Sequence, residues 1–405
     1  ADLRGASFAV ARLERVAFIR ADLRGAVLPR QMAQCVFDQA ILRDVDQAQR
    51  EQEEAELSGR DLSGSDLAGV DLGGLDLSGA CLRECSLMGA NLRGANLSGA
   101  DFEGAVMSDC DLRDADLTGA NLTRCMLANA NLQGADLRDR HIETSMLTGA
   151  DLSGADLSGT KLERVSLADA DLSGANLTRS VLLQVVMTGA KLGGAILERT
   201  SFDNVNLSDV DLSEVRFVGL SMPRCCFANV DLGGRKLVDC DFTSSEFTDT
   251  NLAEAELDGC VIREASFYRA KLGRAKLRDL DAKGCFLGEA DLSRADLRKS
   301  RLRYATFTKA KLHQARLDGC DLRETIFHET DATAASLQDA DLTWADLSHA
   351  NLSLTNLSRA DLSRANLHAV REDRTQWDGA DRTTVRRTDE ALLQAEQWKP
   401  PAKNA

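Results

Sequence analysis

The sequence predicts a repeat solenoid, one long structure built from a short repeated unit, and three observations predict it. A large apolar residue returns every five positions from Leu57 to Leu367 without a break in phase, with Ala282 and Ala332 as the two exceptions. A small residue, most often alanine, stands two positions before each of these centres. A period of five matches neither an α-helix nor a simple β-strand, so the internal repeat decides the fold.

Individual repeat units point to a known pattern. Close copies of one unit are ADFEG at residues 100–104, ADLSG at 155–159 and ADLSR at 360–364. These units resemble the pentapeptide-repeat family, whose unit is written A(D/N)LXX, and the resemblance extends over most of the chain. It implies an all-β solenoid, a right-handed quadrilateral β-helix with four repeats per coil. In that fold the central residue and the residue two before it point inward, and the other three point outward.

Breaks in the repeat suggest how the chain is organised. The phase slips by one residue near Pro29, and the repeat disappears over residues 43–56, which are rich in Gln, Glu and Ala. We interpret that stretch as a loop or short helix inserted in the solenoid or joining two stacks, with a disordered linker as the alternative. The predicted segments are an N-terminal pentapeptide-repeat stack at 1–42, the insertion at 43–56, the main β-helix at 57–370 and a C-terminal capping segment at 371–405.

The C-terminal segment contains a short predicted α-helix over residues 388–399. Thr388 or Asp389 can cap its first turn, and the prolines at 400 and 401 end it. Because the end of a β-helix exposes unpaired strand edges and an open core, we expect the helix to cover that end. Pairing of two rods is the alternative role, and in either case the apolar side of the helix is formed by Leu392, Leu393 and Trp398.

Charge and hydropathy indicate which kinds of partner and which cellular compartment to expect. The net charge of −15 argues against direct nucleic-acid binding through a basic patch. No run of 18 apolar residues occurs, so we expect no membrane span, and no signal peptide is apparent in the sequence as given. The expected location is the cytoplasm of a bacterium. The chain begins inside a repeat and without Met, which suggests a segment of a longer protein.

The eleven cysteines follow the repeat. Nine of them occupy the small inward position, where they replace alanine as small buried hydrophobic residues. Cys240 and Cys260 should stack on successive coils, near enough for a disulfide by distance alone, although reduced thiols are the expected state. No cysteine pair has zinc-finger spacing.

No catalytic constellation is apparent. The five histidines all fall at outward phases and look scattered, and the aspartates belong to the repeat itself. The glycines also follow the repeat and form no phosphate-binding motif. We therefore expect a protein that is not an enzyme, with no metal site and no cofactor.

One outward face is nearly free of charge. Among residues directly before and after the centres on the face from Leu87 to Phe327, Glu246 is the only Asp, Glu, Lys or Arg. A long uncharged β surface is a candidate interface for a partner, a second copy or an absent part of a parent protein, and ordinary solvated β-formers are the alternative. We call this surface the neutral face and select from it Val106, Met126, Met146, Val186, Tyr268, Phe286 and Ile326.

The interior of the same face has a pattern of its own. Five phenylalanines recur in one predicted column, with Leu287 at the gap, and they are Phe227, Phe247, Phe267, Phe307 and Phe327. We interpret the column as core stacking.

Charge also varies along the chain. Residues 51–250 sum to −17 and residues 261–320 to +8. The second stretch is a candidate docking site for an acidic partner, or a solvated surface in which aspartates alternate with the cations. We call it the basic belt, and it comprises Lys271, Arg274, Lys276, Arg278, Arg294, Arg298, Lys299, Lys311 and Arg316.

Three classes of function follow. The first is a non-enzymatic interaction scaffold or adaptor that binds a protein partner of unknown identity, with self-association possible. Pentapeptide repeats also resemble segments appended to bacterial type VI secretion accessory proteins, which gives a narrower version of this hypothesis.

The alternative is DNA mimicry, which the resemblance implies through quinolone-resistance members of the family that bind DNA gyrase. The acidic stretch carries fewer charges per length than B-DNA, and the basic belt would interrupt the mimic. A purely structural rod is the third possibility.

Overall fold

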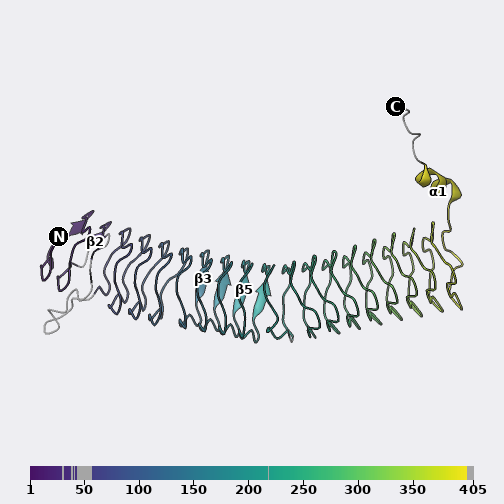
Figure 1. Ribbon diagram of the computed structural model, residues 1–405, viewed down its shortest axis with the longest axis horizontal. Coiled ribbons are helices and arrows are strands. Elements are labelled where there is room, and N and C mark those ends of the chain that lie inside the picture. Colours follow the sequence, from purple (N-terminus) through teal and green to yellow (C-terminus); the bar gives the residue numbers. More distant parts are fainter. Residues whose placement is uncertain (30–31, 38–39, 41, 43–56, 218, 399–405) are drawn as a thin grey trace, which may run out of the picture. The chain divides into compact units, whose positions relative to one another are not determined.

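A computed structural model of the chain describes residues 1–29, 32–37, 40, 42, 57–217 and 219–398 (Figure 1). The chain forms two compact units, Ala1–Val215 and Arg216–Ala405. Each unit consists of stacked coils, and the predicted insertion at 43–56 lies outside the described residues.

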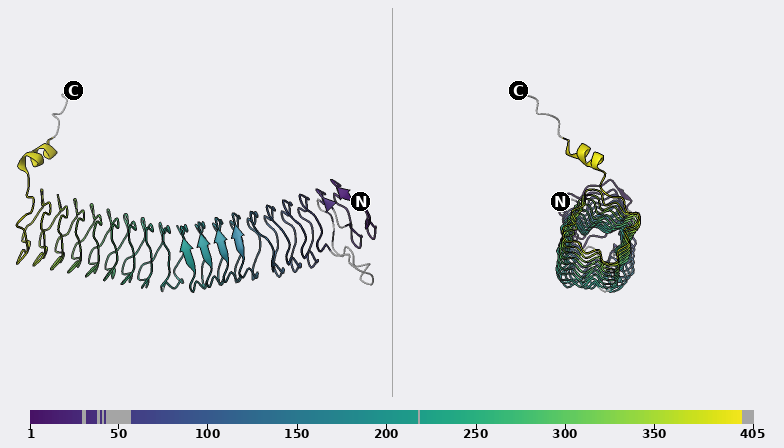
Figure 2. Two further views of the ribbon diagram at one scale, coloured as in Figure 1. Left: turned by 180° about the vertical axis from the view of Figure 1, so that it is seen from behind. Right: turned by 90° about the vertical axis from the view of Figure 1, so that its right-hand side faces the viewer.

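Each coil pairs with the next coil at an offset of four repeats. Four successive repeats show the pattern, with parallel bridges that join Asn96 to Asp116, Asp101 to Asn121, Val106 to Met126 and Asp111 to Asn131. A coil therefore holds four repeat units, and the view along the coils has a four-sided outline (Figure 2). The quadrilateral β-helix predicted from the repeat is confirmed within each unit.

Regular secondary structure beyond isolated bridges is sparse. Strands β1 (Leu13–Glu14) and β2 (Met32–Ala33) form a parallel pair. A four-stranded parallel sheet contains β3 (His141–Glu143), β4 (Lys161–Glu163), β5 (Val181–Leu183) and β6 (Ser201–Asp203), and each strand pairs with the equivalent strand of the next coil. The helix α1 spans Glu390–Gln397 in the second unit, inside the predicted range of 388–399.

A tight turn after each centre makes the corner of the coil. The Ala90 N–H donates to the Leu87 carbonyl at 2.9 Å, and Gly89 has a φ of 66°. A four-residue turn with positive φ at its third position favours glycine there. Other corners place residues such as Asp114 and Trp344 in the same conformation, with φ of 60° and 63°. The repeated backbone hydrogen bonds therefore maintain this conformation even without glycine.

The Asp or Asn before each centre supports the same corner. The Asp101 carboxylate accepts from the Glu103 N–H at 3.1 Å, which is a turn made by a side chain that mimics backbone. Asparagine also links coils, because the Asn121 amide donates to the Asp101 carboxylate at 2.8 Å. The D/N position of the repeat thus has a structural purpose, and its acidity does not mark a catalytic site.

The core of each coil is filled by the two inward positions. Leu92 is fully buried and Ala90 is 1% exposed, which is the packing expected for a large centre and a small neighbour. Where Ser, Thr or Cys replaces Ala, its side chain commonly donates to the carbonyl of a centre in the preceding coil. Ser145 does so to Leu122 at 2.7 Å and Cys85 to Leu62 at 2.8 Å. These contacts satisfy polar groups that are otherwise buried.

The predicted phenylalanine column is confirmed in the second unit. The rings of Phe227 and Phe247 stack with centroids 4.8 Å apart, as do those of Phe247 and Phe267. Phe307 and Phe327 stack at 4.7 Å. The interplanar angles of 3°, 1° and 2° follow from the in-register pairing, which places equivalent rotamers directly above one another.

The N-terminal coils join the rest of the first unit directly. Asp2 pairs with Asp22, one full coil further on, but Leu13 pairs with Met32, one position short of a full coil, as the predicted phase slip requires. The Met32 N–H then donates to the Asp61 carbonyl at 3.1 Å. Coils on either side of the predicted insertion are therefore hydrogen-bonded to each other, while the boundaries of the four segments stay predictions.

All eleven cysteines carry reduced thiols, and the nine at the inward position are buried. Cys81 and Cys226 are half-buried. Cys240 and Cys260 lie at equivalent positions of successive coils, where the Cys240 thiol donates to the Phe217 carbonyl at 3.4 Å and the Cys260 thiol donates to the Leu237 carbonyl at 2.7 Å. Burial raises the pKa of other inward thiols, to about 12 for Cys85 and Cys125.

The column predicts a large stability loss for Phe247→Ala. The ring is fully buried between two stacked neighbours, so its removal should cost about 3–5 kcal/mol of unfolding free energy. Chemical denaturation followed by circular dichroism measures this loss. Phe286→Ala is the control, because that ring is 40% exposed and should matter far less. Equal losses for the two variants would contradict the column as a core element.

Thiol reactivity should separate the two classes of cysteine. We expect a disulfide reagent to modify Cys81 and Cys226 before any other cysteine of the native chain, because they are half-buried and the inward thiols are shielded. Release of the coloured thiolate measures the rate, and denatured protein gives the total. A Cys81→Ala, Cys226→Ala variant should lack the fast phase. A fast phase that survives in this variant would show that inward thiols are accessible.

Candidate functional site

The neutral face in the first unit is a continuous ladder. Val106 pairs with Met126, Met126 with Met146, Met146 with Ser166, and Ser166 with Val186. The side chains of Met126, Met146 and Val186 are 40%, 48% and 40% exposed. Thr148 and Ser166 share a hydrogen bond of 3.0 Å on the same surface. The structure thus assembles the four predicted residues of this unit into one apolar, uncharged strip.

The neutral face of the second unit is more aromatic. Tyr268 and Phe286 lie with ring centroids 6.0 Å apart, and Ile326 follows two coils after Phe286 on the same ladder. Phe286 and Ile326 are 40% and 41% exposed. The Phe286 ring covers Gly288, where an added Cβ would lie 2.4 Å from the ring Cζ. Gly288 therefore allows the ring to lie flat on the coil surface.

Most cations of the basic belt already have acidic partners. Lys276 pairs with Glu256 at 2.6 Å and Arg298 with Asp296 at 2.6 Å. The bridged positions Glu256, Lys276, Asp296 and Arg316 alternate in sign from coil to coil. Lys271, Lys299 and Lys311 have no carboxylate within ion-pair distance among the described residues. The alternation reduces the local positive field, and docking of an acidic partner stays a prediction.

Two more residues of the belt, Arg274 and Arg278, also pair with carboxylates, whereas Arg294 contacts a neutral amide. Arg274 pairs with Glu254 at 3.2 Å, and Arg278 pairs with Asp258. Arg294 donates to the Gln314 side chain at 2.9 Å. Glu254, Arg274 and Arg294 line a shallow groove of about 450 Å³, together with His313.

Helix α1 has a polar N-cap and leaves its apolar side chains largely exposed. Asp389 is its N-cap, and the carboxylate accepts from the N–H groups of Ala391 and Leu392 at 3.0 and 3.1 Å. Leu392 is 49% exposed, Trp398 is 68% exposed and Leu393 is half-buried, so the helix buries no residue. In this arrangement the three apolar side chains do not cover the core, and their burial gives the predicted capping role no support.

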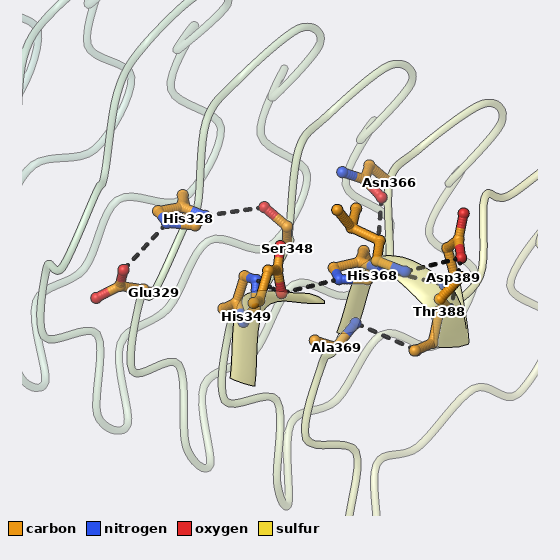
Figure 3. Close-up of polar contacts among 12 residues, drawn as sticks. His328, Glu329, Ser348, His349, Asn366, His368, Ala369, Thr388 and Asp389 are labelled. Atoms are coloured by element: carbon orange, nitrogen blue, oxygen red, sulfur yellow. Dashed lines mark hydrogen bonds and ion pairs between the residues drawn. The ribbon is translucent and has the colours of Figure 1, made fainter. Parts of the chain in front are cut away.

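A row of histidines lies where the helix meets the coils (Figure 3). The ring centroids of His328 and His349 are 5.3 Å apart, and those of His349 and His368 are 5.4 Å apart. Both ring nitrogens of His328 are engaged, Nδ1 with Ser348 at 2.9 Å and Nε2 with Glu329 at 3.1 Å. We call His328, His349 and His368 the histidine row.

Glu396 of helix α1 joins two members of the row. Its Oε2 lies 3.2 Å from His349 Nε2 and 3.3 Å from His368 Nε2. The Asp389 N–H donates to His368 Nδ1 at 3.2 Å. His368 is only 5% exposed, because the start of the helix and the Glu396 side chain lie over its ring. The surrounding pocket measures about 460 Å³ and is also lined by Arg386 and Arg387.

The expectation that the histidines are scattered is wrong for these three. His328 and His368 occupy equivalent positions two coils apart, and His349 lies next to the equivalent position 348 in the coil between them. Sorting every histidine by its position within the four-repeat coil would have revealed the row. Glu396 has no such signal, because it lies on a helix outside the repeat. Together with His349 and His368 it forms the one group among the described residues that could hold a metal ion.

No helix among the described residues has the length and the apolar character needed to span a bilayer.

Solved structures of pentapeptide-repeat proteins resemble this chain. QnrB1, a plasmid-mediated fluoroquinolone resistance protein, is 20% identical over 47% of this chain and 96% of its own, with a TM-score of 0.33. HetL from Nostoc sp., a protein involved in heterocyst differentiation regulation, is 28% identical over 63% of this chain and 90% of its own, with a TM-score of 0.17. A pentapeptide repeat protein of the Arabidopsis thaliana thylakoid lumen is 32% identical over 29% of this chain and 68% of its own, with a TM-score of 0.21.

No curated protein sequence matches the chain significantly. The family described as Pentapeptide repeats (8 copies) matches this chain in a series of segments, many of them overlapping, that together cover most of the chain. The matched residues are 1–29, 53–87, 71–109, 85–124, 105–139, 147–184, 182–219, 225–263, 240–279, 275–314, 300–339 and 335–371. Proteins of this family fold as right-handed quadrilateral β-helices, and they are generally structural or interaction proteins. The chain belongs to the pentapeptide-repeat family.

Proposed function

We propose that the protein is a non-enzymatic interaction scaffold that binds another protein through the neutral face. The observation that carries the proposal is the strip of half-exposed apolar side chains in the first unit, Met126, Met146 and Val186, on one continuous ladder. Backbone pairing between coils fixes the spacing of these side chains, so the surface is ordered before a partner arrives. Such preorganisation reduces the entropy lost on binding.

The chemistry of the strip specifies the kind of partner. It offers no charge for a salt bridge, and its methionines are flexible and polarisable, which suits apolar surfaces of irregular shape. We therefore infer a partner protein whose contact surface is apolar and uncharged at its centre. In the second unit, Tyr268, Phe286 and Ile326 offer a similar surface with aromatic anchors, which are frequent where binding energy concentrates.

The proposal also includes a cellular compartment and a narrower form of the scaffold hypothesis. Nine buried reduced thiols suit a reducing compartment, and we infer the bacterial cytoplasm. An adaptor role in a type VI secretion system is the narrower form of the scaffold hypothesis. It depends on the resemblance of pentapeptide repeats to segments of such accessory proteins.

DNA mimicry with gyrase or topoisomerase as the partner is the second candidate. The observation in its favour is a regular array of acidic side chains, such as Asp151 paired with Asp171 on successive coils. One oxygen of each of these carboxylates is used by a turn, since Asp151 accepts from the Ser153 N–H at 2.9 Å and Asp171 from the Ser173 N–H at 3.0 Å. The other oxygen of Asp171 pairs with the Lys191 ammonium at 3.3 Å, so of these two carboxylates the Asp151 group is the better match for a phosphate oxygen.

The neutral face is tested by charging it. A Met146→Glu, Val186→Glu variant should lose its partner, because binding would then bury two unpaired carboxylates. Capture from a bacterial lysate by immobilised protein, followed by mass spectrometry, identifies the proteins retained. A Gln133→Glu, Ser213→Glu variant is the matched control, since both positions are exposed in the same unit on a different face.

Each outcome of this capture is decisive. A protein that is lost only with the neutral-face variant supports the scaffold. Gyrase subunits retained equally by all three proteins would favour mimicry through the acidic faces. Self-association that disappears with the neutral-face variant would make the partner a second copy. A set of captured proteins unchanged by either variant and free of gyrase would overturn the proposal.

A further inference from the structure

The contact between helix α1 and the coils is built from metal-binding side chains. His349 and His368 come from successive coils of the second unit (Figure 3). Glu396 comes from the last turn of helix α1. One nitrogen or oxygen atom from each of these three residues lies within 4.8 Å of the other two. Elements distant in sequence therefore present three ligand atoms to one point.

The two distances from the Glu396 carboxylate to the histidine nitrogens match a zinc coordination shell. Ligand atoms about 2.0–2.1 Å from a tetrahedral zinc ion lie about 3.3 Å from one another. The Glu396 Oε2 atom is 3.2 Å from His349 Nε2 and 3.3 Å from His368 Nε2. Two imidazoles and one carboxylate also form a common ligand set for zinc with one open position.

We propose that His349, His368 and Glu396 bind one zinc ion per chain. Two imidazole nitrogens and one carboxylate oxygen favour zinc over magnesium or calcium, which prefer oxygen ligands. The pocket of about 460 Å³ leaves room for a water molecule as the fourth ligand. The second-unit helix and coils supply all three ligands, so the site needs no partner chain.

Zinc binding at His368 involves a change in its hydrogen bonds. The Asp389 N–H donates to Nδ1, so the ring proton lies on Nε2 in the metal-free protein and points to Glu396. Zinc takes the lone pair of Nε2, so the single ring proton moves to Nδ1, where it faces the Asp389 N–H and breaks that hydrogen bond. Binding therefore shifts the start of helix α1 slightly and releases the Nε2–Glu396 hydrogen bond.

The ion would fasten a helix that has little else to hold it. Helix α1 has eight residues and buries none of them, and isolated helices of this length are unstable in water. A zinc ion shared with His349 and His368 would join the helix to two coils. Leu392 and Trp398 would then be presented in a fixed position at this end of the second unit.

The site is tested on the full chain without an affinity tag, freed of metal with a chelator. Titration with zinc chloride in a calorimeter should show one equivalent bound. Cobalt(II) should give weak visible absorption bands of a nitrogen and oxygen site, without the strong near-ultraviolet band of a thiolate ligand. This difference separates the proposed site from adventitious binding by Cys81 or Cys226.

Single substitutions then locate the ligands. His349→Ala, His368→Ala and Glu396→Gln should each weaken zinc binding by more than about 100-fold, since even outer partners of metal ligands contribute 10-fold to 100-fold. His328→Ala is the matched control and should bind zinc like the unaltered chain, because both His328 nitrogens are engaged by Ser348 and Glu329. Circular dichroism verifies that each variant keeps its β-helix.

A second readout follows the helix itself. Zinc should slow tryptic cleavage after Arg386 and Arg387, which line the pocket beside the helix, and Glu396→Gln should abolish this protection. Less than one equivalent of zinc, a thiolate band with cobalt, or unchanged binding in a His349→Ala, His368→Ala double variant would overturn the proposal. An equal loss of zinc binding in His328→Ala would also overturn it.

Discussion

Within each unit, parallel pairing of one coil with the next is the constraint from which the other features follow. Because the backbone pairs in register, each side chain lies above the side chain at the equivalent position of the previous coil. Phe227, Phe247 and Phe267 consequently stack with nearly parallel rings. The same register allows an inward Ser, Thr or Cys to reach a carbonyl of the coil before it, so most of these polar residues enter the core with a hydrogen bond made, and Ser180 is an exception.

Register has a different consequence on the surface, because like charges stacked about 4.8 Å apart repel each other. The chain uses several arrangements to limit this repulsion. Asn121 donates to Asp101, and Lys276 is bridged to both Glu256 and Asp296. On the neutral face most of the charges are simply absent. The neutral face and the basic belt therefore both reduce the repulsion between stacked like charges. Of the two, only the neutral face presents an apolar surface.

The regular coils and the end of the second unit contribute different chemistry. In the coils, aspartates and asparagines are occupied by turns and ladders, and most of the thiols are buried. At the last coils the repeat decays, and helix α1 brings a carboxylate to two histidines that the repeat itself would leave pointing outward. His368 becomes almost fully buried there although its position in the repeat is an outward one. Distinct binding chemistry can thus arise where a non-repeat element meets the solenoid.

The sequence by itself determined the coil. A five-residue period and alternate large and small inward residues specify which side chains are buried, and coil arithmetic predicts the phenylalanine column and the neutral face. It also contained enough to place His328 in the same column as His368, since only residue spacing is involved. The tertiary structure alone decided where helix α1 lies, and therefore that Glu396 meets His349 and His368 while Leu392 and Trp398 stay exposed. A helix that follows the repeat has no register with the coils. Its position is therefore determined by its contacts in the folded structure, and the period of the sequence does not predict it.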